Sequence, residues 1–176
     1  MKLNNKGFSL VELIVVVLIM AIVTGTATVS VVIVYNARVK KAARVLRSQL
    51  ELCRQKTMAK EDKTGTSGVY MKLYLEDGDY YATIYDGETI VKSEKLGSDQ
   101  LTIKVGPKNT SISSMDKIED GHEAIYKFKK SSGGVDSTYT SSSGGNPYLS
   151  IYVEGNENYH LMIAEYTGRC YMEADE

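Results

Sequence analysis

The chain has 176 residues, of which 43% are hydrophobic and 24% charged, so it can form a packed core and wholesale disorder is excluded. Its two cysteines are too few for a small disulfide-stapled fold, and two histidines without a CxxC pair leave little for a structural zinc site. Two prolines exclude collagen-like and proline-rich classes. We therefore expect one domain with an appendage.

Charge is divided along the chain although the net charge is only −1. Residues 1–7 are basic, and residues 8–37 carry a single charge, Glu12. Residues 38–61 hold eight basic and two acidic groups, a net of +6, whereas residues 62–176 hold eleven basic and nineteen acidic groups, a net of −8. This order predicts a leader, a membrane span, a basic stalk that suits anionic lipid, and an acidic globular part without general affinity for nucleic acids.

An apolar run of 25 uncharged residues extends from Leu13 to Ala37. A helix that spans a bilayer needs about 20 mostly apolar residues, so the run predicts a retained membrane span. The alternative is a secretory signal that is cleaved after Ala27 and leaves Thr28 as the mature N-terminus. Glu12 at the start of the run, and the apolar stretch that continues beyond Ala27, favour the span.

Glu12 carries a carboxylate at the mouth of this run, where an unpartnered charge is costly. A cut just before Phe8 would create an α-amine four residues, or about one helical turn, from Glu12. The amine and the carboxylate could then pair within one chain or between neighbouring chains. The other interpretation, that Glu12 lies in the interfacial layer, stays open.

The segment KGFSLVEL (residues 6–13) resembles the prepilin cleavage signature of type IV pilins and type II secretion pseudopilins. The resemblance implies that a prepilin peptidase cuts between Gly7 and Phe8, that Phe8 is N-methylated, and that Glu12 sets the register of subunits in a filament. It also implies a type IV pilin-like fold with the globular part outside the cytoplasm, first as a single-pass membrane protein and then in a surface pilus or pseudopilus.

Two features depart from that pattern. The five Lys and Arg residues of segment 38–47 outnumber those of the leader, which by the positive-inside rule would place the stalk in the cytoplasm. We expect the opposite orientation, because a leader is useful only to a peptidase that faces the cytoplasm. The apolar run also lacks the proline that major pilins usually carry, which favours a minor subunit.

Residues 38–60 keep a helical period, because apolar or small side chains recur at steps of three and four. This stripe consists of Val39, Ala42, Ala43, Leu46, Leu50, Cys53 and Thr57. The sequence therefore predicts one helix over residues 8–60, with an amphipathic second half (38–61) laid on a sheet. Glycines in the following loop end the helix.

The globular head, residues 62–176, has the pattern of short strands. We expect three strands over 68–94 with turns at Asp77-Gly78 and Asp86-Gly87, and a polar loop over 131–147. Further strands are expected at 101–105, at 123–129 and, as a meander, within 148–172. One long helix and seven or eight strands predict an α+β fold with the helix packed on an antiparallel sheet.

The head also resembles the GspH/FimT-like minor pseudopilins. The segments that carry this resemblance are ELCRQKTMAK (51–60), IYKF (125–128) and YHLMIAEYTGRCYM (159–172). Some members of that group have a second basic residue after a terminal Gly-Arg pair. Here Cys170 and Tyr171 follow Arg169, so we do not expect DNA as a partner.

No arrangement of residues predicts an enzyme, a metal site or a cofactor. His122 and His160 lie far apart without spaced ligands, and Asp77-Gly78-Asp79 indicates a tight turn rather than a calcium loop. Cys53 and Cys170 are expected to be two buried free thiols, and a disulfide between the stalk helix and the last strand is the alternative.

The favoured function is therefore structural. We expect a subunit, of the minor or pseudopilin kind, of a type IV pilus or a type II secretion-like filament. Its expected partners are other pilin subunits, the prepilin peptidase and methyltransferase, an assembly platform and membrane lipid. The alternative is a pilus-associated adhesin that binds through the loop 131–147.

Overall fold

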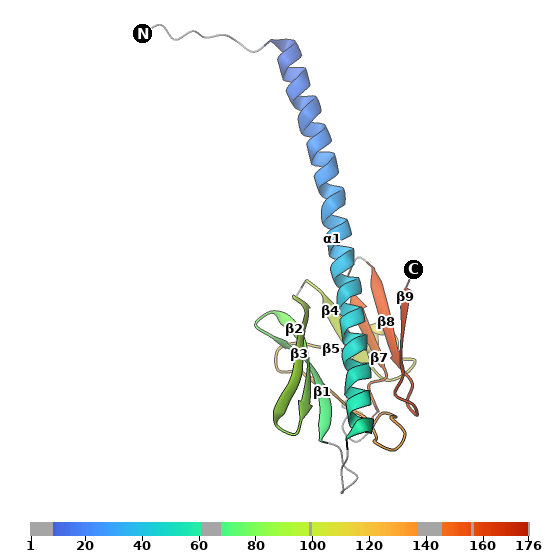
Figure 1. Cartoon of the computed structure of the whole chain (residues 1–176). Coiled ribbons are helices and arrows are strands. Elements are labelled where there is room, and N and C mark those ends of the chain that lie inside the picture. The colour runs from blue at the N-terminus through green and yellow to red at the C-terminus, as the bar shows by residue number, and fades with distance from the viewer. Residues whose placement is uncertain (1–8, 61–67, 99, 137–145, 156, 176) are drawn as a thin grey trace. The chain divides into compact units, whose positions relative to one another are not determined.

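The computed structural model describes residues 9–60, 68–98, 100–136, 146–155 and 157–175. Within these residues the chain forms one α-helix, one short 3-10 helix and nine strands (Figure 1). Residues 1–35 and residues 36–176 form two compact units. The predicted α+β class and the antiparallel pairing of the strands are confirmed.

Helix α1 extends over Leu10–Ala59, close to the predicted bounds. In its second half, every residue of the predicted stripe is buried. The sequence pattern missed one neighbour, Gln49, which is only 1% exposed. The periodicity therefore identified correctly the face of α1 that lies against the head.

The first sheet consists of β1 (Val69–Glu76), β2 (Asp79–Asp86), β3 (Thr89–Ser98) and β6 (Ala124–Lys127), in the order β3-β2-β1-β6. Asp77 and Gly78 have positive φ angles of 51° and 77°, and they join β1 to β2 in the predicted two-residue turn. Tyr70 and Tyr85 stack across these strands with ring centroids 5.1 Å apart. The hairpins predicted from the two Asp-Gly pairs are confirmed.

The second sheet has the order β5-β4-β7-β8-β9. Its strands are β4 (Thr102–Gly106), β5 (Asp116–Lys117), β7 (Ser150–Glu154), β8 (Asn158–Ile163) and β9 (Cys170–Asp175). The division of the strands into two sheets was not predicted, and it arises because β4 pairs with β7. Strand β5 and the 3-10 helix Ile112–Ser114 were also not predicted.

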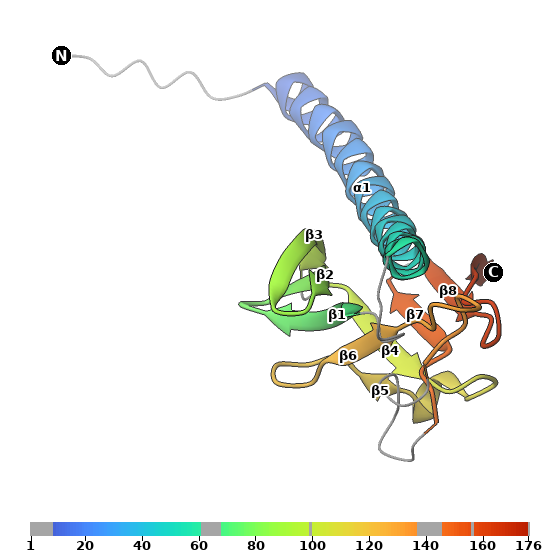
Figure 2. The ribbon, with the colours of Figure 1, turned by 60° about the horizontal axis from the view of Figure 1, so that its bottom comes forward.

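Polar contacts join the second half of α1 to both sheets of the head. Lys60 pairs with Asp86 at the end of β2, and the Glu51 carboxylate accepts a hydrogen bond of 3.4 Å from the Cys170 backbone N–H in β9. Arg54 Nε donates to the Thr167 carbonyl oxygen at 2.6 Å. Figure 2 shows this half of α1 above strands of both sheets. The helix therefore bridges the two sheets and shares their core.

Candidate assembly site at the N-terminal helix

Ser9 caps the start of α1. Its side-chain oxygen accepts a hydrogen bond of 3.2 Å from the Glu12 backbone N–H, and its carbonyl oxygen accepts one of 3.1 Å from the Leu13 N–H. Ser9 is therefore the N-cap, and Glu12 stands three residues later, at the spacing of a capping box. This role was not predicted from the sequence, although the S-x-x-E pattern of residues 9–12 signals it.

Glu12 lies exposed in the first turn of α1. A carboxylate there interacts favourably with the positive end of the helix dipole, so Glu12 has a local stabilising role. Gly7 and Phe8 lie outside the described residues. The cleavage between them, the methylation of Phe8 and the pairing of its amine with Glu12 remain predictions.

Apolar side chains are exposed on all sides of the first turns of α1. The seven consecutive residues from Leu13 to Ile19 are each between 45% and 60% exposed, and Leu10 is 76% exposed. A helix that is apolar all round is one that becomes buried, in lipid or against other proteins. This surface is therefore the part of the chain best suited to assembly.

A membrane span was predicted within residues 8–37. In the portions of the chain that the structure describes, no helix is both long enough and apolar enough to cross a membrane.

The second half of α1 presents a basic face. Lys40, Lys41, Arg44 and Arg47 are all exposed and lie outside the buried stripe, with Arg44 near Tyr159 and Arg47 near Cys170 in the second sheet. No ion pair involves any of these four side chains among the described residues. This face is therefore available for contact with an acidic partner.

Both cysteines are buried free thiols, with Cys53 fully buried and Cys170 2% exposed. Burial raises the pKa of each thiol from 9.0 to about 12, since a thiolate is poorly solvated in the core. The structure does not contain the alternative disulfide. The two residues lie instead in the layer where α1 meets the second sheet.

The remaining candidate residues do not come together in one site. His160 stacks on Tyr152 with ring centroids 4.3 Å apart and hydrogen-bonds Ser150, whereas His122 Nδ1 lies 2.8 Å from the Lys117 carbonyl oxygen. No group of three or more His, Cys, Asp or Glu side chains that could hold a metal occurs in the described part of the chain. Of the loop 131–147 proposed for adhesion, residues 137–145 lie outside the described residues.

Residues 2–28 match the prokaryotic N-terminal methylation motif, a segment that includes Gly7, Phe8 and Glu12. No curated protein and no solved structure matches the chain significantly. The methylation motif, which is that of a prepilin leader, supports a relationship of this chain to type IV pilin-like proteins.

Proposed function

We propose that the chain is a structural, non-enzymatic subunit of a type IV pilus or a type II secretion-like filament. In this proposal a prepilin peptidase removes residues 1–7 and Phe8 is methylated. The subunit is anchored at the membrane until the assembly platform transfers it to the surface filament. The match of residues 2–28 to the methylation motif is the observation that carries the proposal.

The exposed apolar surface of α1 supports the same conclusion. Moving one large apolar side chain out of water stabilises an assembly by roughly 1.5–3 kcal/mol. Helix α1 exposes such side chains on every turn between Leu10 and Val23. When the surrounding medium is lipid, the gain comes instead from close packing and from pairing Glu12. Packing against the helices of neighbouring subunits would supply both the close packing and a partner for Glu12.

We also propose that the subunit is of the minor kind, similar to the GspH/FimT-like proteins. The absence of a proline between Leu13 and Ala37 supports this finer assignment. The amphipathic second half of α1 and the C-terminal strands β8 and β9 occupy the segments on which that resemblance rests.

Substitution of Glu12 tests the proposal. We expect both Glu12→Ala and Glu12→Gln to lower the amount of subunit in purified filaments by about tenfold, because neither neutral side chain can pair with an α-amine. Glutamine can still serve in the capping box but carries no charge, so Glu12→Gln tests charge pairing separately from helix capping. The head should stay folded, as judged by its thermal transition.

The matched control is Glu88→Gln, which removes a carboxylate that is exposed in the turn between β2 and β3. If Glu12→Gln assembles as well as the wild-type chain while Glu12→Ala does not, Glu12 acts only as a capping residue. If both variants assemble normally, the proposed register role is wrong.

A further inference from the structure

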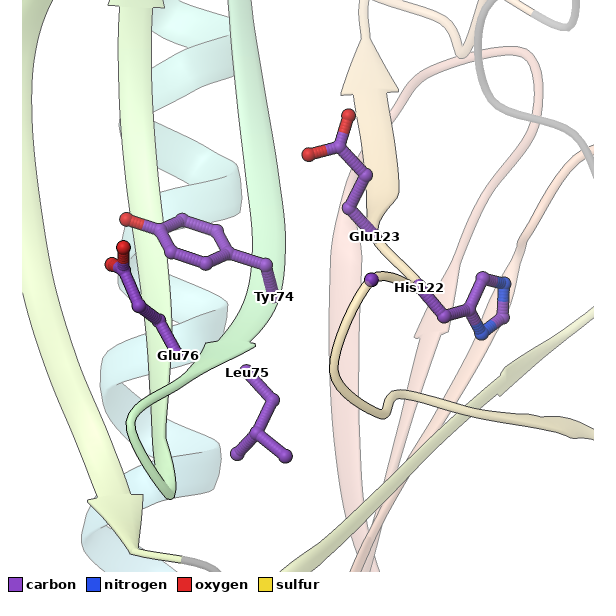
Figure 3. A pocket seen from close by; sticks show the side chains of 6 residues that line it. Tyr74, Leu75, Glu76, His122 and Glu123 are labelled. Atoms are coloured by element: carbon purple, nitrogen blue, oxygen red, sulfur yellow. The ribbon is translucent and has the colours of Figure 1, made fainter.

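A small cavity lies at the end of β1, where the chain returns to begin β6 (Figure 3). It has a volume of about 190 Å³ and is lined by Tyr74, Leu75 and Glu76 on one side and by Gly121, His122 and Glu123 on the other. A parallel bridge between Leu75 and Asp120 holds the two segments together. We call this cavity the carboxylate pocket.

The carboxylate pocket has an excess of negative charge. Glu123 pairs with Lys72 at 2.8 Å, but Glu76 has no ion pair among the described residues. Glu76 also lies directly opposite Asp79 in the β1–β2 register, and like charges at such positions repel one another. Lys95 pairs with Asp79 at 2.5 Å, which leaves Glu76 without a cation.

Two features of the pocket suit an arginine side chain. Two further exposed acids, Asp77 and Asp120, directly adjoin the lining residues Glu76 and Gly121 in the chain, and neither forms an ion pair within the described part of the chain. Tyr74 contributes an aromatic ring beside the carboxylate of Glu76 (Figure 3). One face of this ring stacks on Tyr81, with ring centroids 5.8 Å apart, so only its other face can receive a further group. A guanidinium can bind a carboxylate through two parallel hydrogen bonds and stack on an aromatic ring, which an ammonium group does less well.

The same chain carries the complementary group on α1. Arg44 lies at the centre of the basic face, three or four residues from Lys40, Lys41 and Arg47. Like charges at these helical spacings repel one another, so an anionic partner that covers the face would relieve this repulsion. No ion pair joins this face to the carboxylate pocket of the same chain within the described residues.

We propose that the carboxylate pocket of one copy binds the Arg44 side chain of a second copy. In this contact Lys40 and Lys41 approach Asp77 and Asp120, the exposed acids next to the pocket in the chain. The two surfaces are different patches of one chain, so the contact is heterologous, and repeating it extends an open assembly unless the rotation closes a ring. This inference rests on the proposed function, because it assumes that copies meet in a filament.

Charge reversal with rescue tests the contact in the purified full-length chain. Sedimentation in detergent measures self-association of Arg44→Glu, of Glu76→Arg and of the double variant that exchanges the two charges. We expect each single variant to weaken association by about tenfold and the double variant to restore it to within about threefold of wild type. Association of the wild-type chain should also weaken as salt increases.

Lys56→Glu and Glu88→Arg are the matched controls, since both residues are exposed and lie outside the proposed contact. Both controls should associate like the wild type, and circular dichroism should show every variant folded. The proposal is overturned if the single variants associate normally, or if the double variant associates no better than Arg44→Glu. It is also overturned if only Arg44→Glu weakens association, a result that points to another partner such as anionic lipid.

The same variants are then scored for incorporation into filaments in cells. Failure of the wild-type chain to enter any filament contradicts the proposed function, whereas the sedimentation result still decides the contact. Normal filaments from all the single variants contradict the contact and leave the proposed function standing.

Discussion

Burial governs the acid–base behaviour of three side chains, one on α1 and two in the head. The pKa values of Cys53 and Cys170 rise to about 12 chiefly because both thiols lie in the core. The pKa of Tyr148 also rises to about 12, first through burial and then through the hydrogen bond of 3.0 Å that its hydroxyl donates to Asp116. In each case the fold favours the neutral form of the group.

These shifts predict a loss of stability in alkali. The unfolded chain gives up these protons near their ordinary pKa values of 9.0 and 10.0, whereas the folded chain holds them to about 12. The contribution of these groups to the free energy of unfolding is thus fully present below about pH 9, and it is lost as pH rises towards 12. Urea unfolding at pH 7, 9 and 11 measures the effect.

Tyr148→Phe isolates one of these groups. Between pH 9 and 11 this variant should lose less stability than the wild type, by on the order of 1 kcal/mol. The exposed Tyr166 provides the control, and Tyr166→Phe should follow the wild-type curve. An identical alkaline slope in all three proteins would contradict the assigned role of Tyr148.

At the scale of elements, the sequence predicted those features that local patterns determine. The buried stripe of α1 followed from a period of three and four residues, and the β1–β2 and β2–β3 hairpins followed from Asp-Gly turns that require positive φ at glycine. The division into two sheets was not predictable in this way. It depends on which distant strands pair, as when β1 pairs with β6 and β4 with β7.

The stripe makes a prediction about stability. Leu50 is fully buried between α1 and the sheets, so Leu50→Ala should destabilise the head by about 2–5 kcal/mol through lost contacts and the cavity left behind. The exposed Gln55 lies on the same helix, and Gln55→Ala should change stability by less than about 0.5 kcal/mol. Equal urea midpoints for the two variants would show that this half of α1 is not packed on the head.

At the scale of the whole molecule, the separation of basic and acidic residues along the chain corresponds to two different surfaces. The basic segment and the acidic head predicted from the sequence supply the two surfaces of the proposed contact between copies. The basic face could be anticipated from residues 38–47, but the carboxylate pocket could not. Glu76 and Glu123 are far apart in the chain, and only the pairing of β1 with β6 brings their segments together.

The functional prediction rests on a short local motif near the N-terminus. The leader pattern predicts roles for Gly7, Phe8 and Glu12, and the segment that matches the methylation motif contains all three residues. Ser9 stands within the same motif, and its capping role emerged only from the hydrogen bond to Glu12. The wider head offers no such motif, which is why its assignment remains a proposal.

The mass of the intact chain isolated from its native cells tests the account most directly. We predict a chain of 169 residues that begins at Phe8 and carries one N-terminal methyl group. Gly7→Leu should block the cut and leave the leader attached. A wild-type chain that begins at Met1, or at Thr28 after conventional signal cleavage, would contradict the account.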